Sequence, residues 1–220
     1  MNALISSLEK ELYDFYRNFG VSDRFKGDFI YLANAYDEIE KLWLKQFTQM
    51  QRVKYIMLSE APLFGEKKSY IYNEDAPQTQ FFYFTDVQAF IGSPINSKQE
   101  LFEALSRSGL IILDIFPFAF NDTTALQYSK FSKGKNNGYK SLFDLTYPKY
   151  FRKKLDLILS KAIDPVICFY RYDRVKENVH EILMEKLSDD QDRLILKDAP
   201  SISQPGGGID RVRLKEIITG

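Results

Sequence analysis

Four short apolar runs predict the strands of a sheet. They cover residues 53–58, 109–114, 165–170 and 193–196, contain β-branched residues, and end in polar or turn residues. Continuous apolar runs of this length are typical of strands that are buried on both faces, as in parallel sheets. The pattern therefore favours a sheet whose two faces are both covered.

Helical patterns separate and follow these runs. They cover residues 98–107, 148–162, 174–187 and 210–218. Strands that alternate with helices predict an α/β fold with three α/β/α layers, in which a mostly parallel four-stranded sheet lies between helices. Helical spacing also predicts a helix that stops at Gly20 and a second one over residues 33–50. We expect residues 1–220 to form a single domain, with residues 1–50 as an N-terminal helical extension.

The two longest connections indicate where a functional site lies. Residues 63–96 and 116–147 are connections of about thirty residues each, far longer than an ordinary strand-to-helix loop. Both leave the carboxyl ends of predicted strands. Open parallel sheets bind ligands at that edge, so we expect the site there.

The composition describes an ordinary globular chain of 220 residues, 45% hydrophobic and 27% charged. Thirty Lys and Arg residues balance thirty Asp and Glu residues, which excludes a uniformly basic protein that wraps nucleic acid. The balance conceals a basic segment, residues 127–154, in which eight Lys or Arg residues face one Asp and the net charge is +7. The neutral total is therefore compatible with DNA binding.

Scarce residues exclude several kinds of chemistry. Cys168 and His180 are the single Cys and the single His, so an internal disulfide, a Cys-based zinc site and a site with two His ligands are excluded. His180 falls inside a predicted helix, which argues against a Ser-His-acid triad. We expect no cofactor and no metal; the metal alternative is a magnesium site formed by Glu60 and Asp114 alone.

No stretch of the chain is apolar for long enough to span a bilayer. The first nineteen residues also lack the uninterrupted apolar core of a signal peptide. We therefore expect a cytoplasmic protein with no membrane partner.

Two acids lie where predicted strands end. Glu60 follows the first apolar run by two residues, and Asp114 terminates the second run. If the two strands are neighbours, both carboxylates project into one cleft, where one could orient or deprotonate a water and the other could bind a polar substrate edge. The alternative is that each acid caps the turn or helix that follows it.

Two segments are candidates for contact with nucleic acid. The first is the glycine-containing loop 133–140, in which Lys133, Lys135 and Lys140 could bind phosphates beside aromatic residues that stack on bases. A solvated surface loop is the alternative. The aromatic residues at 70–72 and 81–84 could supply a stacking ring, although each of them is also a candidate for the core.

The second segment, residues 199–208, is rich in small residues and precedes the last predicted helix. Ser201 and Ser203 offer hydroxyls, three glycines allow close backbone approach, and Arg211 and Arg213 begin the helix. This combination suits a phosphate contact, and a flexible hinge is the alternative.

Taken in chain order, these elements resemble the uracil-DNA glycosylase superfamily. Ser59-Glu60-Ala61-Pro62 is similar to the Gly-Glu-Ala-Pro-Gly opening motif of its iron–sulfur branch. The run 110–114 resembles the strand that ends in a base-reading Asn, and Ala199-Pro200-Ser201 is similar to a late His-Pro-Ser motif. The resemblance covers residues 53–220.

The resemblance implies a four-stranded parallel sheet between helices and an enzyme that flips a damaged base out of DNA and hydrolyses its glycosidic bond. By motif, Glu60 would orient the water and Asp114 would read the base edge. The remaining implied site residues are Ala61 and Pro62 beside the base, Tyr72 as the stacking ring, and Pro200 and Ser201 against the DNA backbone.

The chain departs from the family pattern at several positions. Ser59 and Leu63 replace the glycines of the opening motif, Asp114 replaces the Asn, and Ala199 replaces the His. A chain with one Cys cannot hold the iron–sulfur cluster. The sequence thus predicts a divergent DNA base-excision glycosylase. The alternatives are a non-catalytic nucleic-acid or nucleobase-binding protein of the same fold, and a small-molecule hydrolase that uses the same acids.

Overall fold

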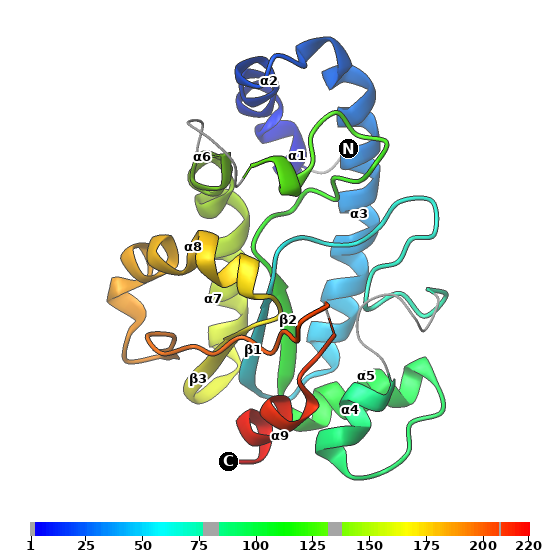
Figure 1. The fold of residues 1–220 in the computed structure, drawn as a ribbon, viewed down its shortest axis with the longest axis vertical. Helices are drawn as coiled ribbons and strands as arrows, with labels where there is room; N and C mark the ends of the chain where they lie inside the picture. The colour runs from blue at the N-terminus through cyan, green and yellow to red at the C-terminus, as the bar shows by residue number, and fades with distance from the viewer. Residues whose placement is uncertain (1–2, 77–83, 132–137, 207) are drawn as a thin grey trace.

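A parallel sheet forms the centre of the molecule (Figure 1). The computed structural model describes residues 3–76, 84–131, 138–206 and 208–220, and in this part of the chain four strands form one sheet. The strands are β1 (Val53–Ser59), β2 (Leu110–Asp114), β3 (Ala162–Tyr170) and β4 (Leu194–Ile195). Their order is β2-β1-β3-β4, and every pairing is parallel. The predicted α/β fold is therefore confirmed, with each strand inside or overlapping a predicted run.

Helices occupy the predicted stretches and two others. The predicted ones are α5 (Lys98–Ser108), α7 (Arg152–Ser160), α8 (Asp173–Lys186) and α9 (Arg211–Thr219). A π-helical turn (Tyr147–Phe151) precedes α7, and the chain enters β3 at Ala162, earlier than expected. Helices α4 (Phe84–Ile91) and α6 (Gly138–Thr146) lie in the long connections. The expectation of a flexible loop over 133–140 is wrong from Gly138 onward, because α6 begins there.

The N-terminal region contributes a wall of the core. It forms α1 (Ala3–Ser7), α2 (Glu9–Asn18) and α3 (Phe25–Gln49), so the long helix starts earlier than the predicted residue 33. Buried residues of α3, among them Tyr36 and Trp43, belong to the same hydrophobic cluster as the strands. The described part of the N-terminal helical extension is therefore packed into the domain.

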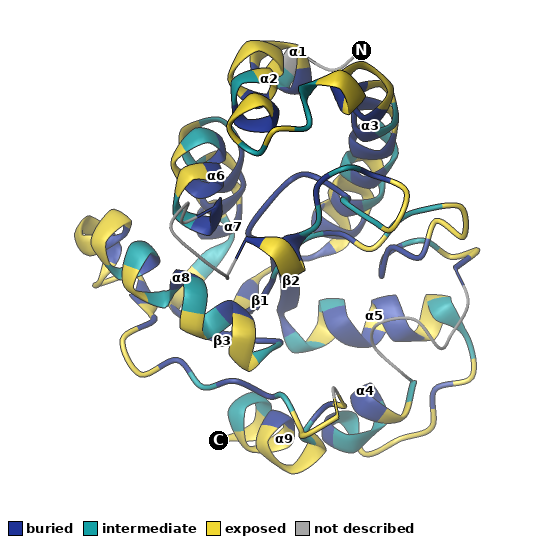
Figure 2. Ribbon diagram, turned by 45° about the horizontal axis from the view of Figure 1, so that its top comes forward, coloured by how far each residue is buried: buried dark blue, intermediate teal, exposed yellow. Residues whose placement is uncertain are grey.

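Helices cover both faces of the sheet. In Figure 2, α6, α7 and α8 lie on one side of the strands, and α4, α5 and α9 lie on the other. Helix α3 runs beside β2 and contacts α5 through Gln46, whose side-chain amide donates to the carbonyl of Phe102 at 3.0 Å. This arrangement is the three-layer architecture that alternating strands and helices predict.

Two side chains form hydrogen bonds with the backbone at the outer edge of β2 and seal it from water. The indole N–H of Trp43 donates to the Ile112 carbonyl at 2.9 Å, and the Ile112 N–H donates to the hydroxyl of Tyr72 at the same distance. All three residues are buried. An edge strand leaves backbone groups unpaired, and a buried unpaired group costs free energy, so these contacts allow β2 to be an edge strand inside the protein.

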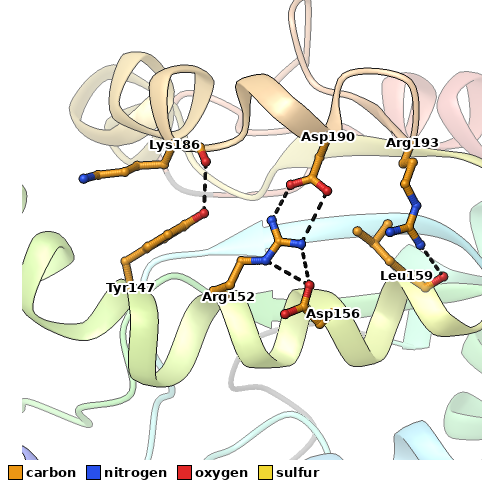
Figure 3. A network of polar contacts seen from close by, with 7 residues as sticks. All are labelled: Tyr147, Arg152, Asp156, Leu159, Lys186, Asp190 and Arg193. Atoms are coloured by element: carbon orange, nitrogen blue, oxygen red, sulfur yellow. Dashed lines mark hydrogen bonds and ion pairs between the residues drawn. The ribbon is translucent and has the colours of Figure 1, made fainter.

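A network of polar contacts joins α7 to the segment that leads into β4 (Figure 3). The Arg152 guanidinium at the start of α7 binds the carboxylates of Asp156, one turn later, and Asp190. Nearby, the hydroxyl of Tyr147 donates to the Lys186 carbonyl at 3.0 Å. These contacts hold the end of α8 against α7, on the same side of the sheet.

Replacement of Tyr72 by Phe tests the seal on β2. Tyr72→Phe leaves the Ile112 N–H buried without a partner, so we expect the free energy of unfolding to fall by about 1–3 kcal/mol in urea denaturation. The matched control is Tyr147→Phe, which removes a hydroxyl bond to a backbone carbonyl near the surface and should cost less than about 0.5 kcal/mol. Equal losses in the two variants would contradict the sealing role.

Candidate functional site

The strand order reverses beside β1. From β1 the chain passes to β2 on one side, and from β2 it crosses back to β3 on the other side. In open parallel sheets, ligands bind outside the carboxyl ends of the strands at such a reversal. Ser59, Asp114 and Tyr170 end the three strands that meet there, and the candidate site surrounds them.

A small cavity lies at the carboxyl end of β2. It is lined by residues 61–63, residues 69–71, and Ile112 and Asp114 of β2. Its volume is about 10 Å³, which is room for about one water molecule. Three residues predicted for the site, Ala61, Pro62 and Asp114, therefore line the same cavity.

Asp114 is a buried acid in this cavity, with 3% of its surface exposed. Burial raises the pKa of its carboxyl to about 7, against the opposing effects of the Lys154 ammonium and of hydrogen bonding by Ser59 and Tyr70. Lys154 is itself buried, lies 2.7 Å from a carboxylate oxygen of Glu40, and stands 4.1 Å above the ring of Trp43. Asp114 can therefore exchange a proton near neutral pH.

Tyr70 gives the cavity an aromatic ring and a hydroxyl. The residue is 2% exposed, and its hydroxyl makes no hydrogen bond of ordinary geometry within the described residues. The hydroxyl is nevertheless near enough to Asp114 to lower the pKa of that carboxyl. A buried hydroxyl without a good partner is costly, so a polar group on a water or a ligand in the cavity would stabilise it.

Tyr72, which we expected to be the stacking ring, is not among the residues that line the cavity. Its ring is 2% exposed and packs at 5.7 Å from the ring of Tyr70 and 6.0 Å from that of Phe102. Its hydroxyl is used on Ile112. Tyr70 takes the position beside the cavity, which spacing alone could not decide because the segment has no regular secondary structure.

Glu60 has a different environment from Asp114. The Tyr139 hydroxyl donates to its Oε1, and the Arg174 guanidinium donates to its Oε2 at 2.6 Å. Its side chain is 13% exposed. Burial raises the pKa of Glu60, while the Tyr139 hydrogen bond and the positive charge of Arg174 oppose that rise. The carboxylate is therefore held at both oxygens.

The two acids do not line the same small cavity, contrary to our expectation of one cleft. Asp114 pairs in register with Ser59, and Glu60 follows Ser59. Successive side chains of a strand point to opposite faces, which separates neighbours at a strand end. Accordingly, Asp114 lines the cavity, and Glu60 is absent from that lining and is bound by Tyr139 and Arg174.

Tyr139 and Arg174 bind Glu60, a role that sequence reasoning did not assign to either residue. Each is the second residue of a helix, α6 and α8 respectively. The sequence could have indicated Arg174. Helix α8 begins three residues after β3 ends, so its first turn must lie at the carboxyl edge of the sheet. Tyr139 had no comparable signal, because α6 was not predicted.

The late segment continues the sheet beside β3. The Tyr170 N–H donates to the Pro200 carbonyl at 2.8 Å, and Ser201 forms a parallel bridge with Tyr170. Ser201 is buried, and its hydroxyl accepts from the Ser203 N–H at 3.1 Å. Residues 200–201 are therefore bound to β3 through their backbone, and the Ser201 hydroxyl already has a partner inside the chain.

The basic residues that we expected to contact nucleic acid lie in different surroundings. Arg211 binds the buried carboxylate of Asp86 at 2.8 Å and the hydroxyl of Thr85, so its charge joins α9 to α4. Lys140 lies on α6, 3.7 Å from Asp144. Lys133 and Lys135 lie outside the described residues, as do three members of the aromatic run, residues 81–83.

A larger groove borders the cavity. It has a volume of about 590 Å³ and lies between α3, residues 64–69 and residues 121–123; Ser69 lines both hollows. The Tyr31 hydroxyl organises its floor, because it accepts from the Gly65 N–H and the Asn121 amide and donates to the Ala119 carbonyl. Two lysines and three acids line the groove, and this net charge of −1 does not suit a polyanion.

The described residues form neither a metal site nor a membrane-spanning helix. Among the described residues, no group of three or more His, Cys, Asp or Glu side chains is arranged to hold a metal ion. Every helix in the described part of the chain is too short or too polar to cross a membrane.

His180 contacts the Tyr170 hydroxyl through Nδ1 at 3.1 Å, within the packing of α8 on β3.

Comparison of the chain with protein-family models, with curated proteins and with solved structures gave no match in any of the three. The function is therefore inferred from the site itself.

The raised pKa of Asp114 predicts a pH-dependent stability. The folded state keeps a proton on this carboxyl up to about pH 7, whereas the unfolded chain releases it near the ordinary value of 3.8. This contribution is fully present below pH 3.8 and is lost as the pH rises through about 7. Between about pH 5 and about pH 8, urea denaturation should show the stability of Asp114→Asn rising relative to wild type by about 2–3 kcal/mol.

Asp122→Asn, at an exposed position of the groove, controls for the removal of a carboxylate. A stability difference between Asp114→Asn and wild type that stays constant with pH would show that Asp114 remains ionised in the fold.

Proposed function

We propose that this protein is a divergent base-excision glycosylase that hydrolyses the N-glycosidic bond of a flipped, damaged base in DNA. The observation that carries the proposal is the cavity beside β2, which is lined by a buried acid, by a tyrosine whose hydroxyl lacks a hydrogen bond of ordinary geometry, and by residues 61–63. A flat ring with a polar edge would meet a ring, a carboxyl and apolar walls there, as base-flipping enzymes require. The motif order supports the same proposal.

The proposed reaction assigns separate roles to the two acids. A water oriented by Glu60 attacks C1′, the C1′–N bond breaks, and the base leaves with the bonding electron pair while Glu60 accepts the proton of the water. Asp114 reads the base edge. Because its pKa is about 7, part of the Asp114 population is protonated at neutral pH and can give a proton to the departing base. Asp114 would thereby replace the His of the family motif, which is Ala199 here.

The cavity must open to admit a base. Its volume of about 10 Å³ suits one water, so residues 61–63 or 69–71 have to move when a base enters. Leu63 is already 45% exposed, and Gly65, between the two segments, has the positive φ of 60° that suits glycine in a turn. The proposal therefore includes a conformational step at this connection.

A panel of DNA duplexes, each with one uracil, hypoxanthine or other damaged base, tests the proposal. We expect the protein to leave alkali-labile abasic sites in at least one duplex. Glu60→Gln and Asp114→Asn should each slow base release by about a hundredfold or more, because each removes a proton-transferring group. Glu181→Gln, at an exposed position of α8, is the control and should act at the wild-type rate. Absence of abasic sites in every duplex would contradict the proposal.

One observation favours a second candidate, a non-catalytic nucleic-acid or nucleobase-binding protein of this fold. Both oxygens of Glu60 are already bound, by Tyr139 and Arg174, which leaves the carboxylate poorly placed to orient a water. In that case the same duplexes should bind with an affinity that falls steeply with salt, without base release and without an effect of Glu60→Gln.

A further inference from the structure

The ion pair between Glu60 and Arg174 joins one firmly held side chain to one loosely held side chain. Glu60 follows β1, is 13% exposed, and keeps a second contact with the buried Tyr139. Arg174 is 47% exposed in the first turn of α8. Its guanidinium has one partner within the described residues, the Glu60 carboxylate. The arginine is thus the member of the pair that can leave.

Arg174 can leave the pair more readily than Glu60 can. Its side chain is half exposed, and a long arginine side chain can turn into solvent while its stem stays packed. Departure of Glu60 would instead require movement of the strand end. An external anion at the surface would therefore compete for the arginine and leave the carboxylate in place.

A backbone phosphate is the anion that fits this position. The planar guanidinium matches phosphate geometry with two parallel hydrogen bonds, which a single contact to one carboxylate oxygen does not use. The first turn of α8 adds the partial positive charge of a helix N-terminus. Helix α6 packs against α8 and carries Lys140, with a side chain 45% exposed, in its first turn.

We propose that Arg174 is an exchangeable partner, which holds Glu60 in the free protein and transfers to a backbone phosphate when nucleic acid binds, so that Oε2 of Glu60 is freed to accept a hydrogen bond from water. The inference rests on the proposed function, because the freed carboxylate is the one assigned to the water. It also removes the conflict that favoured the non-catalytic candidate: Glu60 is occupied in the free protein and available in the complex.

The transfer changes the charge around Glu60 in a defined direction. The groups that face its carboxylate are Tyr139 from α6, Arg174 from α8 and Tyr128, whose own pKa is raised by burial and by Glu60. Of these, Arg174 is the cation. Its loss leaves burial opposed by the Tyr139 hydrogen bond alone, so the pKa of Glu60 rises and the carboxylate becomes a stronger base.

The test follows Glu60 directly by carbon-13 NMR of carboxyl-labelled glutamate in the full chain, with the resonance assigned through Glu60→Gln. The nucleic acid is a short duplex that carries a tetrahydrofuran abasic analogue, which a glycosylase cannot cleave. We expect the pKa of Glu60 to rise when wild type is saturated with this duplex. Arg174→Met should show the higher pKa without DNA and no further rise with it.

Binding measured by fluorescence anisotropy supplies the second readout. Arg174→Met should weaken binding about fivefold and reduce the salt dependence by about one phosphate contact. Arg174→Lys should keep the salt dependence and bind less tightly than wild type, because lysine has the charge without the planar fork. Arg107→Met, at an exposed position of α5 where the arginine also pairs with a glutamate, is the matched control and should behave as wild type in both measurements.

The outcomes separate this inference from the proposed function. If the duplex binds and the pKa of Glu60 does not move, or if Arg174→Met binds with unchanged affinity and salt dependence, the exchange is wrong whether or not base release occurs. If the pKa and binding change as expected while no damaged duplex is cleaved, the exchange is supported and the proposed glycosylase activity is contradicted. If wild type binds no duplex, both proposals are contradicted.

Discussion

The burial of an edge strand is the constraint on which the rest of this structure depends. β2 has one neighbour in the sheet, yet its whole length is buried, so the backbone groups on its other side must find partners outside the sheet. Trp43 from α3 and Tyr72 from the first long connection supply them at Ile112. These two bonds fix a helix from the N-terminal region and an irregular segment against the same strand, and the segment carries Tyr70 to the cavity beside Asp114.

The same edge also holds a buried cluster of charges. Lys154 from α7 lies between the Trp43 ring and the Glu40 carboxylate, and its charge acts on Asp114. Burial lowers the pKa of Lys154, and the two acids oppose that effect. At Asp114, burial disfavours the charged form more strongly than the lysine favours it. The pKa of this carboxyl therefore rises to about 7. The packing that seals β2 therefore also sets the protonation of the acid at its end.

The sequence predicted what local pattern determines. The apolar runs identified each strand, and helices α5, α8 and α9 matched their periodic stretches closely. The strand-end rule assigned Asp114 to the site and the family resemblance assigned Ala61 and Pro62 to it, and these three residues line one cavity. Short helices inside long connections, such as α4 and α6, were missed because each presents few turns of periodic pattern.

Contacts between distant segments could not be predicted in this way. Arg211 was expected to meet an anion at a helix start, and it does meet one, but the anion is Asp86, 125 residues earlier in the chain. The choice of Tyr70 over Tyr72 likewise depends on which hydroxyl reaches Ile112, a matter of tertiary geometry in an irregular segment. Tyr139 and Arg174 became site residues through the packing of α6 and α8 around the end of β1.

The two acids show how one edge of a sheet can hold different chemistry at neighbouring positions. Burial raises the pKa of both carboxyls, but their partners differ: Glu60 has a half-exposed arginine, and Asp114 has a buried lysine. A half-exposed cation can be drawn away by a ligand, so the charge state of Glu60 responds to binding. A buried cation cannot leave, so the raised pKa of Asp114 is set by the fold and does not depend on the departure of a partner. In the proposed reaction this difference matches the roles, because the group that takes a proton from water must change on binding, and the group that meets the base must be ready beforehand.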